Sequence, residues 1–178
     1  MPTATLVATV GGASFNTYAT LAEAEQYYLN RWVGTSTVWS GESDANKNKA
    51  LLFSAKLLDN LILWQGTVVD DTQSMLWPRY GLSFRNGYPI DSTTVPQDLK
   101  DAQSELARQL LVDVTRTDDS DVETQGITEL KAGSVTLRFS EDQAIKMIPD
   151  LVALFIPRTW VEEIRGRAAS SRPLVRGY

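Results

Sequence analysis

The chain has 178 residues, of which 43% are hydrophobic, and a formal net charge of −5, which suits one soluble folded domain with appendages. It has no cysteine and no histidine, which excludes disulfides, thiolate catalysis and histidine general bases, and removes most zinc ligands. No apolar run approaches the roughly 20 residues of a membrane helix, and residues 1–10 lack a signal-peptide pattern. We therefore predict a protein that is not an enzyme and that uses no cofactor, metal or membrane.

The charge is unevenly distributed along the chain. Residues 158–178 carry five arginines and two glutamates, a net charge of +3, so residues 1–157 carry −8. Affinity for nucleic acid comes mainly from neutralised phosphates, so we do not expect the acidic body to coat DNA. The basic tail needs a separate explanation.

The first predicted elements are an arm and a helix. Residues 1–19 are rich in Thr, Ala, Gly and Val, and we expect an extended arm that is ordered by a neighbour, if at all. Thr20 and Glu23 have the spacing of a capping box, which marks a helix start. An apolar stripe at helical spacing follows, at Leu21, Ala24, Tyr28 and Trp32.

A second helix and a long loop come next. The helix is predicted to begin near Ser43 or Asp44 and to end at Gly66, with an apolar stripe at Leu51, Ala55, Leu58 and Ile62. Residues 67–95 show no clean period and hold Trp77-Pro78-Arg79 and the turn-forming Asn86-Gly87. A loop of this length is usually functional or packed on its own aromatic residues.

The third helix has the clearest pattern. Pro96 suits the first helical position, and the helix is expected to reach about Thr115. Its core stripe is Leu99, Ala102, Leu106 and Leu110. A fourth, short helix is predicted near Pro149 to Ile156.

Alternation of apolar and polar residues predicts a β-hairpin over about residues 127–139. Because an isolated hairpin is only marginally stable, we expect it to pack on the helices or on another subunit, or to face a channel. The residues assigned to that role are Ile127, Leu130, Val135, Leu137 and Phe139.

These elements predict a mainly α fold, in which a small bundle of about four helices carries a β-hairpin insertion. The predicted organisation is an N-terminal arm (1–19), a helical domain (20–157) and a C-terminal arm (158–178). The C-terminal arm mixes arginines with apolar residues, which suits an interface. A protein partner is the favoured interpretation, with DNA contact or a solvated tail as the alternatives. The candidate contact residues are Arg165, Arg167, Arg172, Leu174, Val175, Arg176 and Tyr178.

Two other candidate sites have simpler explanations. The acidic residues Asp118, Asp119 and Asp121 lack the ligand spacing of a calcium loop, so we interpret them as a solvated loop. Six aromatic residues could stack on bases, but few cations accompany them, so core or subunit contacts are favoured. They are Tyr27, Tyr28, Trp32, Trp39, Trp64 and Trp77.

The order of motifs over about residues 15–157 resembles a family of tailed-phage head-tail connector proteins, also called adaptor or head completion proteins. Trp-Pro-Arg between two such helices is the most specific feature. The motifs that carry the resemblance are Tyr18-Ala-Thr-Leu-Ala-Glu-Ala-Glu-Gln-Tyr-Tyr, Lys49-Ala-Leu-Leu, Ala55-Lys-Leu-Leu-Asp, Trp64-Gln-Gly, Leu76-Trp-Pro-Arg, Val95-Pro-Gln-Asp-Leu-Lys-Asp-Ala, Glu105-Leu-Ala, Gly133-Ser-Val-Thr-Leu and Ile148-Pro-Asp-Leu-Val.

The resemblance implies a structural adaptor that is made in the host cytoplasm and resides in the neck of the virion. Such a protein docks on the portal as a ring, commonly of twelve copies, extends the DNA channel and presents a surface to the tail or tail nozzle. Double-stranded DNA passes through without specific binding. Some relatives are instead described as DnaT-like single-stranded-DNA-binding proteins, and single-strand binding in phage replication is the alternative function. A carboxylate-based hydrolase is disfavoured because nothing in the sequence positions a catalytic pair.

Overall fold

The computed structural model describes residues 4–31, 37–113, 129–132, 135–138 and 147–165. Its helices are α1 (Leu21–Asn30), α2 (Thr37–Ser40), α3 (Asp44–Leu61), α4 (Gln97–Val112), α6 (Asp150–Phe155) and the 3-10 turn η2 (Arg158–Trp160). Its strands are β1 (Ile62–Trp64), β2 (Thr67–Val68), β3 (Arg79–Tyr80), β4 (Glu129–Ala132), β5 (Val135–Arg138) and β6 (Val161–Ile164). The predicted mainly helical class is confirmed. Among the described helices, none is both long and apolar enough to cross a membrane.

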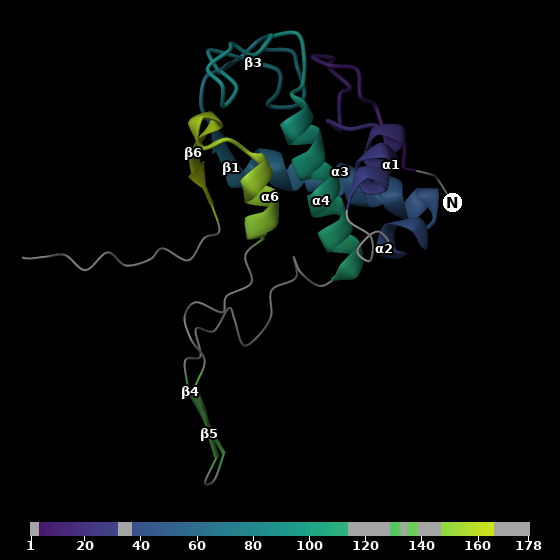
Figure 1. Cartoon of the computed structure of the whole chain (residues 1–178), viewed down its shortest axis with the longest axis vertical. Coiled ribbons are helices and arrows are strands. Elements are labelled where there is room, and N and C mark those ends of the chain that lie inside the picture. Colours follow the sequence, from purple (N-terminus) through teal and green to yellow (C-terminus); the bar gives the residue numbers. More distant parts are fainter. Residues whose placement is uncertain (1–3, 32–36, 114–128, 133–134, 139–146, 166–178) are drawn as a thin grey trace, which may run out of the picture.

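Helix α4 is the centre of the body (Figure 1), where α3, α1 and α6 pack around it. The predicted core stripe is correct, since Leu99, Ala102 and Leu106 are fully buried. The helix is slightly shorter than predicted: Pro96 occupies the N-cap position, and the last helical residue is Val112.

The predicted starts of α1 and α3 are correct. The Thr20 hydroxyl accepts a hydrogen bond from the Glu23 N–H, while the Glu23 carboxylate accepts one from the Thr20 N–H. The Ser43 hydroxyl caps α3 by accepting from the Asn46 N–H. Each cap satisfies backbone donors that the first helical turn leaves unpaired.

The predicted end of the second helix is wrong. Helix α3 stops at Leu61, and residues 62–64 form β1, which pairs antiparallel with β6. Gly66 instead makes the turn between β1 and β2, with a φ of +70°, and a Cβ there would lie 2.2 Å from the Tyr80 carbonyl oxygen. Only glycine fits both the conformation and the space.

The N-terminal segment differs from the predicted arm, because residues 15–19 belong to the core. Gln103 on α4 is fully buried and holds this segment in place. Its Oε1 accepts from the Ala19 N–H at 2.8 Å, and its Nε2 donates to the Thr17 hydroxyl at 2.7 Å and to the Leu51 carbonyl at 2.8 Å. One side chain thus joins the N-terminal segment to α3 and α4.

The C-terminal arm also begins later than predicted. Residues 158–165 continue the fold as η2 and β6, and Trp160 is fully buried. The Trp160 indole donates to the Ser83 carbonyl at 2.7 Å, and its ring lies 5.2 Å from that of Trp77. A core tryptophan therefore lies within the segment that composition alone marks as a basic tail.

The loop at residues 67–95 contains the short β2–β3 pair, and its Trp77 packs in the core against Trp64 and Trp160, which lie outside the loop. Trp77 is fully buried and precedes a cis peptide bond to Pro78. The Arg79 guanidinium donates to the carbonyls of Gln65, Leu76 and Gly66 at 2.7, 3.0 and 2.8 Å. The Trp-Pro-Arg motif thus holds the loop against the end of β1.

The predicted hairpin is confirmed as the β4–β5 pair, in which Leu130 lies opposite Leu137 and Ala132 opposite Val135. Figure 1 shows this pair apart from the helices. Ile127 and Phe139, at the ends of the predicted hairpin, lie outside the described residues.

Candidate functional site

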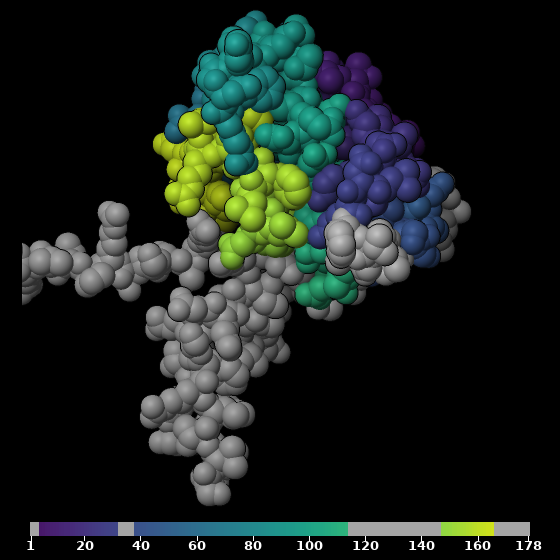
Figure 2. All heavy atoms as spheres, in the orientation of Figure 1, coloured from purple at the N-terminus to yellow at the C-terminus, as the bar shows by residue number. Residues whose placement is uncertain are grey.

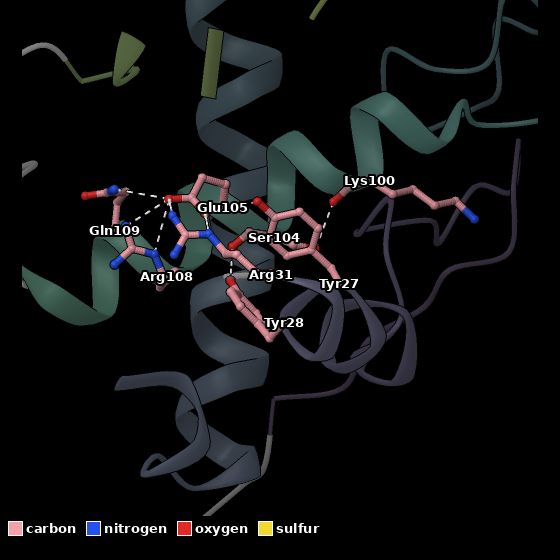
Figure 3. A network of polar contacts seen from close by, with 8 residues as sticks. All are labelled: Tyr27, Tyr28, Arg31, Lys100, Ser104, Glu105, Arg108 and Gln109. Atoms are coloured by element: carbon pink, nitrogen blue, oxygen red, sulfur yellow. Dashed lines mark hydrogen bonds and ion pairs between the residues drawn. The ribbon is translucent and has the colours of Figure 1, made fainter. Parts of the chain in front are cut away.

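A buried polar cluster joins α1 to α4 around Glu105, whose carboxylate is fully buried (Figure 3). Its oxygens accept from Arg31 at 2.9 Å and from Arg108 at 2.8 Å. The Tyr27 hydroxyl and the Gln109 amide also donate to it, at 3.1 and 3.2 Å. We call these five residues the Glu105 cluster.

The arrangement is structural in character. Two guanidinium groups bind the Glu105 carboxylate, so neither of its oxygens is free to act as a base. Burial and the neighbouring Glu105 charge raise the pKa of the Tyr27 hydroxyl, so this hydroxyl stays protonated. The described residues hold no group of three metal-ligating side chains. The contacts of Tyr27 and Arg31 with Glu105 therefore hold the C-terminal end of α1 against α4.

A groove of about 590 Å³ lies beside this cluster, between α1, α4 and α6. Figure 2 shows α1 and α6 on the same face with α4 between them. Apolar walls come from Tyr27, Leu151 and Phe155, and the Tyr27 and Phe155 rings lie 5.9 Å apart. The polar lining residues are Glu23, Gln26, Asn30, Arg31, Gln97 and Asp101.

The two carboxylates of this groove differ in their partners. Glu23 binds the Lys100 ammonium at 2.6 Å, and its pKa is lowered because that contact and the Thr20 hydrogen bonds outweigh burial. Asp101 accepts from the Gln97 amide at 2.8 Å, and burial together with the nearby Asp98 charge raises its pKa. Asp101 is thus the carboxylate that a cationic ligand would stabilise most.

Another carboxylate, Asp59, is half-buried beside the Trp-Pro-Arg loop. It accepts hydrogen bonds from the Tyr18 hydroxyl and from the Leu76 N–H, the latter at 3.1 Å. Burial raises the pKa of Asp59 to about 6, although both hydrogen bonds lower it. This site ties the N-terminal segment, α3 and the loop together.

The aromatic residues considered for base stacking are mostly internal. Tyr28, Trp39, Trp64 and Trp77 are buried, which confirms that they serve the core; Trp32 lies outside the described residues. Among the described residues, Phe53 on α3 has an exposed aromatic side chain. Three further exposed aromatic side chains, which the sequence reasoning missed, are Tyr80, Phe84 and Tyr88, the last 71% exposed.

These three side chains belong to one loop, together with Arg85. The Phe84 N–H donates to the Tyr88 carbonyl at 2.8 Å, and Gly87, with a φ of +86°, completes the turn that Asn86-Gly87 predicted. Arg85 donates to the Leu154 carbonyl at 2.6 Å, at the end of α6. We call residues 80–88 the aromatic loop.

The predicted contact residues of the C-terminal arm lie almost entirely outside the described residues. Arg165 is described and exposed, and its N–H donates to the Leu61 carbonyl at 2.6 Å, which continues the β1–β6 pairing. The remaining residues of that set lie beyond it: Arg167, Arg172, Leu174, Val175, Arg176 and Tyr178.

The sequence reasoning also missed the Glu105 cluster and Gln103. Their signal lies in α4, where polar residues at positions 103, 105 and 108 interrupt a run of positions that are buried on every side. A polar residue in a fully buried helix needs a partner, and the partners Thr17, Ala19 and Arg31 are more than 70 residues away in sequence.

A family model described as "Putative DnaT-like ssDNA binding protein" matches residues 4–177 of the chain. No curated protein and no solved structure matches it significantly.

Proposed function

The chain belongs to this DnaT-like family. We propose that it is a head-to-tail adaptor of a tailed phage. Its copies form a ring on the portal, extend the DNA channel and offer the tail or tail nozzle a surface. The family description supports single-strand DNA binding, which is the second candidate function. The support for the adaptor is the isolated β4–β5 hairpin and the net charge of −8 on residues 1–157.

The observation that carries the proposal is the β4–β5 hairpin. It is a two-stranded sheet with four residues in each strand, and it lies apart from the helices (Figure 1). A sheet of this size has little independent stability in water. Contact with another copy would bury its apolar face, as a heterologous interface in a closed ring does.

The distribution of charge supports the same proposal. Residues 1–157 have a net charge of −8, and several of the basic side chains of the body are paired with carboxylates. Lys47 binds Glu25, Lys100 binds Glu23, and Arg31 and Arg108 bind Glu105. A channel built from such subunits repels phosphate, so DNA slides through it.

The decisive experiment measures mass by light scattering for the chain alone, for its portal, and for the mixture. We expect a complex that contains several copies of the chain for each portal ring. A chain that stays separate from the portal at micromolar concentration contradicts the adaptor function.

The C-terminal arm is the predicted portal contact. Deleting residues 166–178 keeps Arg165 and the β1–β6 pairing, so the variant should fold with wild-type helix content and fail to bind the portal. Unchanged binding by the deletion variant means that the arm has no such role.

Single-strand binding is the second candidate, favoured by the family description and by the aromatic loop. Tyr80, Phe84 and Tyr88 are exposed beside Arg85, which is the composition of a base-stacking site. Tyr88→Ala should weaken binding of a labelled oligonucleotide by about 1 kcal/mol or more. Binding that is tight in ordinary salt and needs Tyr88 would favour this function over the adaptor.

A further inference from the structure

The groove between α1, α4 and α6 exposes apolar surface beside a carboxylate that lacks a cation among the described residues. Leu151 is 40% exposed, and with Phe155 it forms one wall. Among the described residues, only the Gln97 amide donates a hydrogen bond to the Asp101 carboxylate. An occupant with an arginine and adjacent aliphatic side chains would satisfy both features.

The chain itself contains a segment of this chemistry. Arg172-Pro173-Leu174-Val175-Arg176 places two aliphatic side chains between two arginines. Residues 1–157 carry a net charge of −8, whereas residues 166–178 contain three arginines and no acidic residue. The charges of groove and segment are complementary at Asp101.

The segment can also reach the groove. Strand β6 leads the chain to Arg165, and its residues Val161 and Ile164 pack against the same core cluster as Phe155. An extended chain spans roughly 3.5 Å per residue, so a segment with the length of residues 166–178 could cover several times the length of α6, whose six residues rise about 9 Å.

We propose that this groove binds the C-terminal segment of the same chain, residues 166–178, with an arginine on Asp101 and Leu174 or Val175 against Leu151 and Phe155. The groove then shields the cationic, apolar segment until a partner displaces it. The inference goes beyond the adaptor function and needs no portal, so the two proposals fail independently.

The test uses cysteine pairs in the full chain, which has no native cysteine. Leu151→Cys with Leu174→Cys places one thiol in the groove and one in the segment. The matched control is Phe53→Cys with Leu174→Cys, because Phe53 is similarly exposed (44%) and lines a different depression, beside Lys49 and Leu110. Both double variants must keep the wild-type circular dichroism spectrum.

Under mild oxidation with copper phenanthroline, the groove pair should form an intrachain disulfide about tenfold faster than the control pair, because docking raises the effective thiol concentration. Equal rates in the two pairs overturn the proposal. A disulfide that forms only between two chains also overturns it, since the occupant is then a neighbouring copy.

The charge contact is tested separately. Adding Asp101→Asn to the groove pair should slow its disulfide formation about threefold or more, whereas Asp71→Asn, the same charge change on an exposed loop residue, should not. A rate unaffected by Asp101→Asn refutes the arginine contact and with it the proposed docking.

Discussion

Glu105 shows how much the fold depends on one buried charge. Replacing it with glutamine leaves the Arg31 and Arg108 guanidinium groups, with side chains 16% and 10% exposed, without their counter-charge. Removing one partner of a buried ion pair costs about 3–5 kcal/mol, so Glu105→Gln should lower the free energy of unfolding by about that amount in urea titrations. The control is Glu25→Gln, which breaks the more exposed pair with Lys47 and should cost at most about 1 kcal/mol. Equal losses would contradict the structural role of Glu105.

Asp59 predicts a dependence of stability on pH. Its pKa in the folded protein is about 6, above the ordinary value of 3.8, so folding favours the protonated carboxyl. Its contribution to stability is therefore complete below about pH 4 and is lost as the pH rises through 6. From about pH 4 to pH 7, the wild type should lose about 2 kcal/mol more than Asp59→Asn, which cannot ionise.

The measurement is the free energy of unfolding of both proteins at each pH. Comparing the two proteins removes the contributions of groups that they share, such as Glu23 and Asp101. Parallel curves for wild type and variant would show that Asp59 titrates with an ordinary pKa in the folded state.

At the scale of elements, Gln103 connects segments that no local pattern relates. Gln103→Leu has a similar side-chain volume but removes three hydrogen bonds and leaves the Ala19 N–H without an acceptor. The Thr17 hydroxyl still donates to the Ala19 carbonyl, and the Leu51 carbonyl still accepts from the Ser54 hydroxyl. A buried polar group left unsatisfied costs about 1–3 kcal/mol, so we expect a loss within that range and faster hydrogen exchange at the Ala19 amide. Gln26→Leu, on the exposed face of α1, should change neither quantity.

The same distinction between local and distant contacts explains what the sequence could predict. Capping residues and helical periodicity depend on neighbours in sequence, and they placed α1, the start of α3, and α4 correctly. The pairing of β1 with β6 joins residues about 100 positions apart, so it was not visible in any window. Without it, α3 was extended to Gly66, and residues 158–165 were assigned to an arm.

The candidate site was harder to predict than the fold for the same reason. The groove requires three helices from distant parts of the chain, and the Glu105 cluster requires Arg31 to meet Glu105 across 74 residues. The predicted portal-contact residues after Arg165 lie outside the described residues, so their role stays a prediction.

At the scale of the whole molecule, the two candidate functions use different surfaces. An adaptor needs the hairpin and the C-terminal segment, whereas single-strand binding needs the aromatic loop and its Arg85. The described body has large aromatic rings inside, where Trp77 contacts both Trp64 and Trp160. Substitutions on one surface should therefore affect one function and leave the core intact.

Leu137 gives the sharpest test of assembly. It lies opposite Leu130 in the β4–β5 pair, and alternation places it on the same face of the strand as Val135. If this face packs on a neighbouring copy, Leu137→Asp should weaken assembly on the portal about tenfold or more, because a charge would be buried without a partner. Thr136→Asp is the matched control: it lies on the other face, opposite Lys131, and should assemble normally. Thermal unfolding should be the same for both variants, because the hairpin lies apart from the helices (Figure 1). Complete rings from Leu137→Asp, measured by light scattering, would remove the hairpin from the interface.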